Sequence, residues 1–186
     1  VENNPENEEL GNREVVFGRE IYIERNDFME EPVKKFFRLA PGKEVRLKGA
    51  YFITCTDVIK DENGNITEIH CTYDPETKSG SGCTRKVKGT LHWVEASTAV
   101  DIESRLYDYL LKEDSDGKDF LGDFNHDSLQ VFHSKGEACL ANTVPGDHFQ
   151  FLRQGYFVTD KDSTADHIVV NRIVGLRDTW AKQQKK

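Results

Sequence analysis

The strongest restriction on the fold comes from the Asn63-Gly64 pair, which separates two runs of β-forming residues. Both residue types tolerate positive φ, so the pair favours the tight turn of a β-hairpin. The run before the pair covers residues 44–60, and the return strand is expected over residues 66–73. We therefore expect two antiparallel strands in this part of the chain.

Other short β-rich segments are separated by Gly, Asn and Pro. They are residues 14–25, 85–95, 148–160 and 168–174. The Gln154-Gly155 pair predicts a turn, and residues 113–127 are expected to form an acidic loop. Residues 99–111 fit either a helix or a strand, and a strand is favoured because the segments around them are β-rich. Since no amphipathic helix of ordinary length is visible, the sequence predicts an all-β fold of barrels or sandwiches.

The charge of the chain restricts its partners. The 186 residues suffice for one large domain or two small ones. A net charge of −8 argues against a nucleic-acid binder, because such domains are usually basic. Binding depends on the local field, however, and residues 34–48 carry six cations against Glu44 alone. The sequence therefore predicts a basic patch within an acidic chain.

Catalysis and metal binding have little support in the sequence. It contains no glycine-rich phosphate loop, nucleophile elbow or metalloprotease motif, so no catalytic residue is expected. Four residues could form a metal site on paper: His70, Cys71, Cys83 and His92. Their spacing matches no zinc pattern, and buried Cys usually packs as a small apolar side chain, so no metal is expected.

The cellular setting follows from the same absences. No C-x-x-C pair, signal peptide or membrane-length apolar run is present, which indicates a reducing, cytoplasmic location without membrane association. Val1 is not a start methionine, so the chain is expected to be part of a longer protein.

Residues 34–48 interleave cations with aromatic rings, a composition that suits single-stranded RNA. In strand geometry Glu44, Arg46 and Lys48 share one face, so two cations would project together from a sheet. An ordinary amphipathic strand with a charged outer face is the alternative interpretation.

Gln150 and Arg153 form a second candidate. A glutamine amide matches the N3–H and O4 edge of uracil, and an arginine donates to guanine or to phosphate. Residues three apart on a straight strand point to opposite faces, but a turn at Gly155 could bring these two together. Polar residues exposed on a strand without a ligand are the alternative interpretation.

Six segments resemble the C-terminal, anticodon-binding region of glutaminyl-tRNA synthetases, and the likeness covers nearly the whole chain. They are residues 20–28 (EIYIERNDF), 42–47 (GKEVRL), 85–94 (RKVKGTLHWV), 105–108 (RLYD), 149–157 (FQFLRQGYF) and 171–180 (NRIVGLRDTW).

The resemblance implies two β-barrels that hold the anticodon loop of glutamine tRNA, with the distal barrel inserted within the proximal one. Residues 1–13 would be an extended lead-in. Residues 14–34 plus 112–186 would form the proximal barrel, and residues 35–111 the distal barrel. The resemblance also implies a class I parent enzyme, a monomer that uses ATP and Mg²⁺ to attach glutamine. The ATP-binding signatures of the family would precede this region, so no cofactor is expected here.

The residues that match the anticodon-contacting surface of the family are Arg38, Arg46, Lys48, Gln150 and Arg153. By resemblance, Gln150 and Arg153 would read the uracil and guanine that glutamine anticodons share. Arg46 and Lys48 would contact the first anticodon base or its phosphates.

The chain departs from the family pattern at three positions. Some relatives carry Lys where this chain has Phe37, and Gln where it has Lys35, so recognition of the third base can be divided differently here. Lys48 stands where some members have Arg, and a lysine loses the bidentate contact that an arginine makes.

Two alternatives remain open at this point. The same two-barrel region occurs in some glutamyl-tRNA synthetases, although the Gly-Leu-Arg-Asp-Thr-Trp run at residues 175–180 favours the glutamine enzyme. The net charge of −8 also fits a β-barrel module that binds protein rather than RNA.

Overall fold

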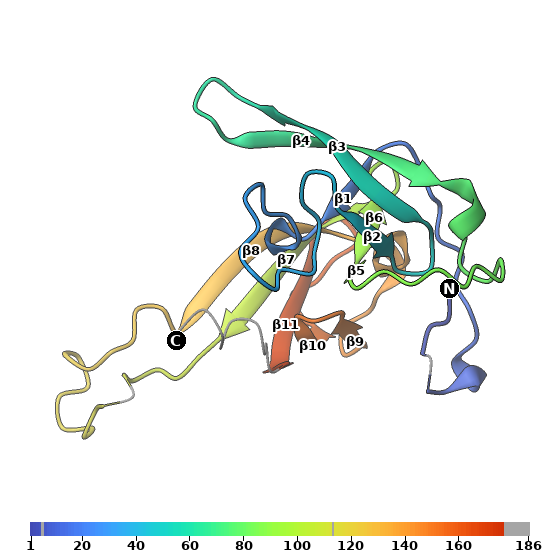
Figure 1. Ribbon diagram of the computed structural model, residues 1–186. Helices are drawn as coiled ribbons and strands as arrows, with labels where there is room; N and C mark the ends of the chain where they lie inside the picture. Colours follow the sequence, from blue (N-terminus) through green and yellow to red (C-terminus); the bar gives the residue numbers. More distant parts are fainter. Residues whose placement is uncertain (5, 113, 177–186) are drawn as a thin grey trace. The chain divides into compact units, whose positions relative to one another are not determined.

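The computed structural model describes residues 1–4, 6–112 and 114–176, which contain eleven β-strands and no helix longer than five residues (Figure 1). The helices are 3-10 turns: η1 Glu8–Leu10, η2 Arg25–Asp27, η3 Pro75–Thr77 and η4 Ala138–Asn142. The predicted all-β fold is confirmed, whereas the closure of the strands into two barrels stays a prediction. Residues 177–180 of the family-like C-terminal run lie outside the described residues.

The chain divides into two compact units, unit 1 over Val1–Thr98 and unit 2 over Ala99–Lys186. Each unit is continuous in sequence, whereas the resemblance implies a proximal barrel interrupted by the distal one. In unit 1, β1 (Ile21–Ile23) pairs with β6 (Trp93–Glu95), so a segment assigned to the proximal barrel bonds to one assigned to the distal barrel. The insertion of one barrel within the other stays a prediction.

The larger sheet of unit 1 has the strand order β4-β3-β2-β5. Its strands are β2 Glu44–Leu47, β3 Phe52–Lys60, β4 Ile66–Asp74 and β5 Thr90–Leu91. The predicted hairpin is confirmed, because β3 and β4 pair antiparallel and the Gly64 N–H donates to the Asp61 carbonyl over 3.0 Å. Gly64 takes a φ of +82°, whereas Asn63 needs no positive φ.

The run at residues 44–60 forms two strands rather than one. The Leu47 N–H donates to the Tyr51 carbonyl over 2.8 Å, and the Ala50 N–H donates to the Leu47 carbonyl over 3.0 Å. Gly49, with a φ of +73°, lets the chain reverse between β2 and β3. This glycine was the local signal for the turn.

Alternation along β2 builds the core of unit 1. Val45 and Leu47 are buried, while Glu44 and Arg46 on the other face are half-buried. The two apolar side chains pack in a cluster with seven other buried residues, namely Phe28, Leu39, Ala50, Ile53, Cys55, Leu91 and Trp93. Period-two burial of this kind is what places the cation of Arg46 on the outer face of the sheet.

Unit 2 contains one five-stranded sheet with the order β8-β7-β11-β10-β9. Its strands are β7 Val100–Tyr107, β8 Leu129–Gly136, β9 His148–Phe151, β10 Gly155–Thr159 and β11 Ile168–Gly175. β7 and β11 run parallel, and the other neighbours are antiparallel. The strand favoured at residues 99–111 is confirmed by β7. The turn expected at Gln154-Gly155 lies earlier, at residues 152–154, and Gly155 begins β10.

Several strands differ from the expectation. β1 occupies only three residues of the segment 14–25, and the segment 85–95 contributes strand only from Thr90 onward. β8 was not expected at all. Seven of its eight residues are exposed, so the strand lacks the alternation of buried and polar residues on which a sequence pattern depends.

A polar network joins β7 to β11. The Arg105 Nε donates to Glu103 Oε1 over 2.6 Å, and Asn171, which lies opposite Arg105 in the sheet, donates to Asp160. The hydrogen bond from Arg105 lowers the pKa of Glu103, and the backbone N–H of Asp162 lowers the pKa of Asp160. Both carboxylates are therefore stabilised in the ionised form. Asp160 also lies 3.8 Å from Arg105 Nη1, so this carboxylate links Arg105 of β7 to Asn171 of β11.

Gly155 is expected to be essential for unit 2. Its φ is +147°, and a Cβ at this position would fall in hard contact with the Val174 carbonyl oxygen. We expect Gly155→Ala to lower the free energy of unfolding by about 2–3 kcal/mol, measured by denaturant titration. Gly146→Ala is the matched control, because φ there is +95° but no atom lies within 4 Å. Equal losses for the two variants would contradict a role for the close approach.

Candidate nucleic-acid interface

Arg46 is held on the outer face of β2 by an aromatic ring. It lies directly opposite Phe52 of β3, and its guanidinium carbon is 4.4 Å from the centroid of that fully buried ring. Arg85 covers the same ring at 5.1 Å and pairs with Glu44 and Asp74. A guanidinium over a ring gains cation–π stabilisation, so Arg46 is restrained while half-exposed.

Lys48 lies one residue beyond the end of β2, and its side chain is exposed. Its N–H donates to the Leu91 carbonyl over 2.9 Å, and its carbonyl accepts from the Trp93 indole N–H over 3.0 Å. The backbone of Lys48 is therefore fixed even though it has left the strand. Glu44, Arg46 and Lys48 were expected to share one face of a strand. Glu44 and Arg46 lie on that face of β2, whereas Lys48 lies just after the end of the strand.

Arg38 is tied to a carboxylate in the interior of unit 1. Its Nη1 lies 3.2 Å from Asp27 Oδ1, and the same nitrogen donates to the Asn26 carbonyl over 3.0 Å. The Asp27 side chain is 0% exposed and that of Arg38 is 21% exposed. Main-chain bonds from the Leu39 N–H to the Asp27 carbonyl and from the Met29 N–H to the Leu39 carbonyl fix the two segments side by side. Arg38 therefore has both a structural contact and an exposed part.

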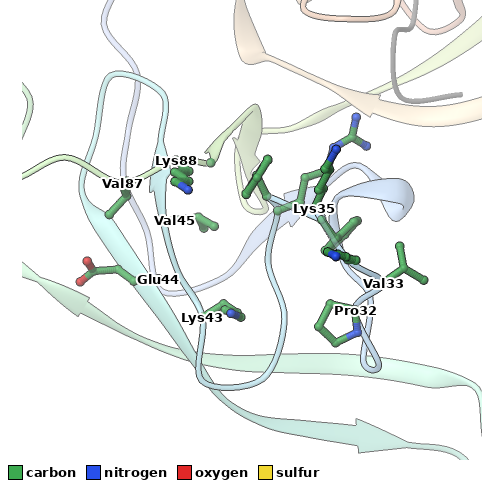
Figure 2. A pocket seen from close by; sticks show the side chains of 13 residues that line it. Pro32, Val33, Lys35, Lys43, Glu44, Val45, Val87 and Lys88 are labelled. Atoms are coloured by element: carbon green, nitrogen blue, oxygen red, sulfur yellow. The ribbon is translucent and has the colours of Figure 1, made fainter. Parts of the chain in front are cut away.

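Arg38 lines a pocket of about 510 Å³ in unit 1, whereas Arg46 and Lys48 do not line it (Figure 2). It is lined by three segments, residues 32–38, 43–45 and 87–89. Five of the lining side chains are cationic and one, Glu44, is acidic; the cations are Lys34, Lys35, Arg38, Lys43 and Lys88. A concave surface with this charge favours an anionic ligand.

Lys88 lines the pocket but was missed by the sequence analysis as a functional candidate. Lys88 lies with its Nζ 4.9 Å from the centroid of the Phe37 ring, and Phe37 is an exposed residue. Residues 85–89 were expected to be strand, but β5 begins only at Thr90. The run of cations at residues 85–88 was the sequence signal for a second basic segment. The sequence pattern alone does not predict that this segment lies beside Phe37.

Gln150 and Arg153 belong to the β9–β10 hairpin of unit 2. Gln150 is exposed and lies opposite Tyr156, and Arg153 is half-buried in the three-residue turn. The Gln154 N–H donates to the Phe151 carbonyl over 2.9 Å and closes that turn. Both side chains thus come from one short hairpin, whereas Arg38, Arg46 and Lys48 belong to unit 1.

The turns at Lys35 and Arg153 share an unusual conformation. These two are the non-glycine residues with positive φ in the described part of the chain, at +69° and +65°. Each is the third residue of a turn closed by a backbone bond, from the Phe36 N–H to the Val33 carbonyl and from Gln154 to Phe151. Type II turns favour Gly at the third position, and a larger residue there costs about 1 kcal/mol or more.

Two of the four residues considered as a metal site, His70 and Cys71, have contacts that do not favour metal binding. His70 lies 2.8 Å from Glu68, and Cys71 lies opposite Cys55 across β3 and β4. Although Cys71 as a whole residue is exposed, desolvation of its thiol raises the pKa to about 12, whereas metal binding needs the thiolate. Over the ranges that the structure describes, no group of three or more His, Cys, Asp or Glu is arranged to hold a metal.

Two family models match the chain, both described as "tRNA synthetases class I (E and Q), anti-codon binding domain". One matches residues 1–74 and the other residues 90–160. The chain belongs to this family of anticodon-binding domains. Among similar proteins, the glutamine–tRNA ligases of Clostridium perfringens and Clostridioides difficile are each 54% identical over 97% of this chain, and that of Vibrio parahaemolyticus is 53% identical over 97%.

The anticodon-binding domain spans about a third of the length of the curated relatives it matches, 34% for the two clostridial ligases. The identity of 54% to the two clostridial ligases confirms the resemblance to glutaminyl-tRNA synthetases. None of the helices within residues 1–4, 6–112 and 114–176 has the length and apolar character that a membrane crossing requires.

Arg38 of the anticodon-binding domain is expected to contribute to stability as well as to any binding. Arg38→Ala would remove the ion pair of a fully buried carboxylate, Asp27. We expect a loss of about 2–3 kcal/mol in the free energy of unfolding, less than for a fully buried pair because Arg38 is partly exposed. Arg19→Ala is the control, because Arg19 is exposed and lines no part of the pocket. A thermal unfolding shift no larger than that of the control would contradict the structural role.

Proposed function

We propose that this chain binds the anticodon loop of glutamine tRNA and serves as the RNA-reading part of a glutamine–tRNA ligase. The observation that carries the proposal is the basic pocket of unit 1, in a chain whose net charge is −8. Cations gathered on one face of an acidic protein would bind a phosphate backbone while the rest of the surface repels it. Membership of the anticodon-binding family supports the choice of tRNA.

The five predicted site residues take two kinds of role in this proposal. Arg38, Arg46 and Lys48 contact the phosphates or bases of the loop from unit 1. Gln150 reads the central uracil through its amide, and Arg153 reads guanine through its guanidinium. Restraint of Arg46 by the Phe52 ring supports its role, because a pre-positioned cation loses less side-chain entropy on binding.

The parent protein would be a class I aminoacyl-tRNA synthetase that acts as a monomer in the cytoplasm. ATP and Mg²⁺ would serve its catalytic part, and this chain would contribute RNA recognition without a cofactor. The proximal barrel would combine residues 14–34 with residues 112–186, and the distal barrel, residues 35–111, would be inserted within it.

The proposal is tested by titrating the 186-residue chain with the anticodon stem-loop of glutamine tRNA at two salt concentrations. A loop with its central uracil replaced serves as the RNA control. We expect tighter, salt-sensitive binding of the glutamine loop. Equal affinity for the two loops would remove base reading from this chain, and an absence of salt-sensitive RNA binding would favour the protein-binding alternative.

Substitutions separate the two roles. Arg46→Ala should weaken binding of both loops and reduce the salt slope by about 0.7, the value for one contact with single-stranded RNA. Gln150→Ala should mainly reduce the preference for the uracil-containing loop, by roughly tenfold. The matched controls are Arg19→Ala and Gln130→Ala, both at exposed positions outside the pocket and the β9–β10 hairpin. If the site variants bind as their controls do, the assignment of these residues is wrong.

Substitution of Lys35 by glycine should lower RNA affinity without lowering the free energy of unfolding. Lys35→Gly removes a cation from the pocket but suits the φ of +69°, so RNA affinity should fall. The free energy of unfolding should stay the same or rise by up to about 1 kcal/mol. Lys35→Ala removes the same charge and keeps the backbone strain, so it should match the glycine variant in affinity and be less stable. A glycine variant less stable than the alanine variant would contradict this account.

A further inference from the structure

Phe37 is a large aromatic residue that is exposed to solvent. Its neighbours Phe36 and Leu39 are buried at 8% and 1% exposure, whereas Phe37 is 51% exposed as a residue and lines the basic pocket. The buried neighbours anchor the segment, so the exposed ring is carried on fixed backbone. An aromatic face held at a basic surface is the feature on which nucleic-acid bases stack.

Lys88 reaches this ring from a distant part of the sequence. Its Nζ lies 4.9 Å from the ring centroid, and Figure 2 places its side chain at the pocket with those of Lys35 and Lys43. The cation–π contact restrains an otherwise flexible side chain, which lowers the entropy that Lys88 would lose on binding a phosphate.

Gly89 fixes the distance between the two segments. A Cβ at residue 89 would collide with the Phe37 carbonyl oxygen, so the backbones approach as closely as a glycine permits. The Gly89 carbonyl also accepts from the Arg46 N–H over 2.9 Å. Gly89, next to Lys88 in sequence, therefore contacts the backbone of Phe37 and bonds to the strand that carries Arg46.

We propose that Phe37 and Lys88 together hold one nucleotide of the bound RNA: its base stacks on the Phe37 ring, and Lys88 neutralises an adjacent phosphate. This inference rests on the proposed RNA-binding function and adds two contact residues to it. An aromatic ring tolerates any base, so the pair contributes affinity and orders the strand rather than reading its sequence.

The test uses the 186-residue chain and the glutamine anticodon stem-loop, with 2-aminopurine placed in turn at each unpaired loop position. In the unsubstituted chain, binding should quench the fluorescence at one position, because the base stacks on a ring. Phe37→Leu should abolish that quenching and weaken binding about tenfold without changing the salt slope. Lys88→Met should lower the salt slope by about 0.7 and keep the quenching.

The matched control is Lys86→Met, because Lys86 is exposed in the same segment and does not line the pocket. Unfolding curves of all three variants should coincide with that of the unsubstituted chain. If Arg46→Ala weakens binding but the Phe37 and Lys88 variants behave as the control does, this inference is overturned and the proposed function stands. If the unsubstituted chain has no salt-sensitive affinity for the stem-loop, both are overturned.

Discussion

Main-chain hydrogen bonds along both edges of β2 hold the candidate site of unit 1 together. On one edge β2 pairs with β3, which brings Phe52 opposite Arg46. On the other edge the Arg46 N–H bonds to the Gly89 carbonyl and the Lys48 N–H bonds to the Leu91 carbonyl. The same strand buries Val45 and Leu47 in the core, so the position of the outer cations is set by the packing of the inner side chains.

Basic residues of unit 1 are restrained by three different kinds of partner. Arg38 has a buried carboxylate, Arg46 has a buried ring and Lys88 has an exposed ring. The two rings stabilise a cation without cancelling its charge, whereas the Asp27 carboxylate offsets that of Arg38. The field that leaves the surface therefore comes more from the residues held by rings than from Arg38. Such an arrangement lets a chain with a net charge of −8 present a local basic surface.

Local signals predicted the elements that depend on local chemistry. Asn63-Gly64 predicted the β3–β4 hairpin, and β-rich surroundings favoured the strand that β7 forms. β8 was missed because it is exposed on both faces, and the break after β2 was missed because Gly49 was not weighted as a turn signal. The basic stretch that lines much of the pocket was recognised as a candidate, but Lys88 was not. Its contact with Phe37 spans about fifty residues of sequence, and no periodicity encodes a contact of that length.

Under the proposed function, affinity and specificity are carried by different chemistry in the two units. Unit 1 offers charges, which attract any phosphate backbone and are weakened by salt. Unit 2 offers the Gln150 amide and the Arg153 guanidinium, whose hydrogen bonds distinguish base edges. Arg153 adopts a positive φ at a cost in stability. Backbone strain of this kind is concentrated at functional sites, where it fixes the direction of a side chain. Lys35 takes the same conformation in unit 1, so under the proposed function it too would accept backbone strain at a position that lines the binding surface.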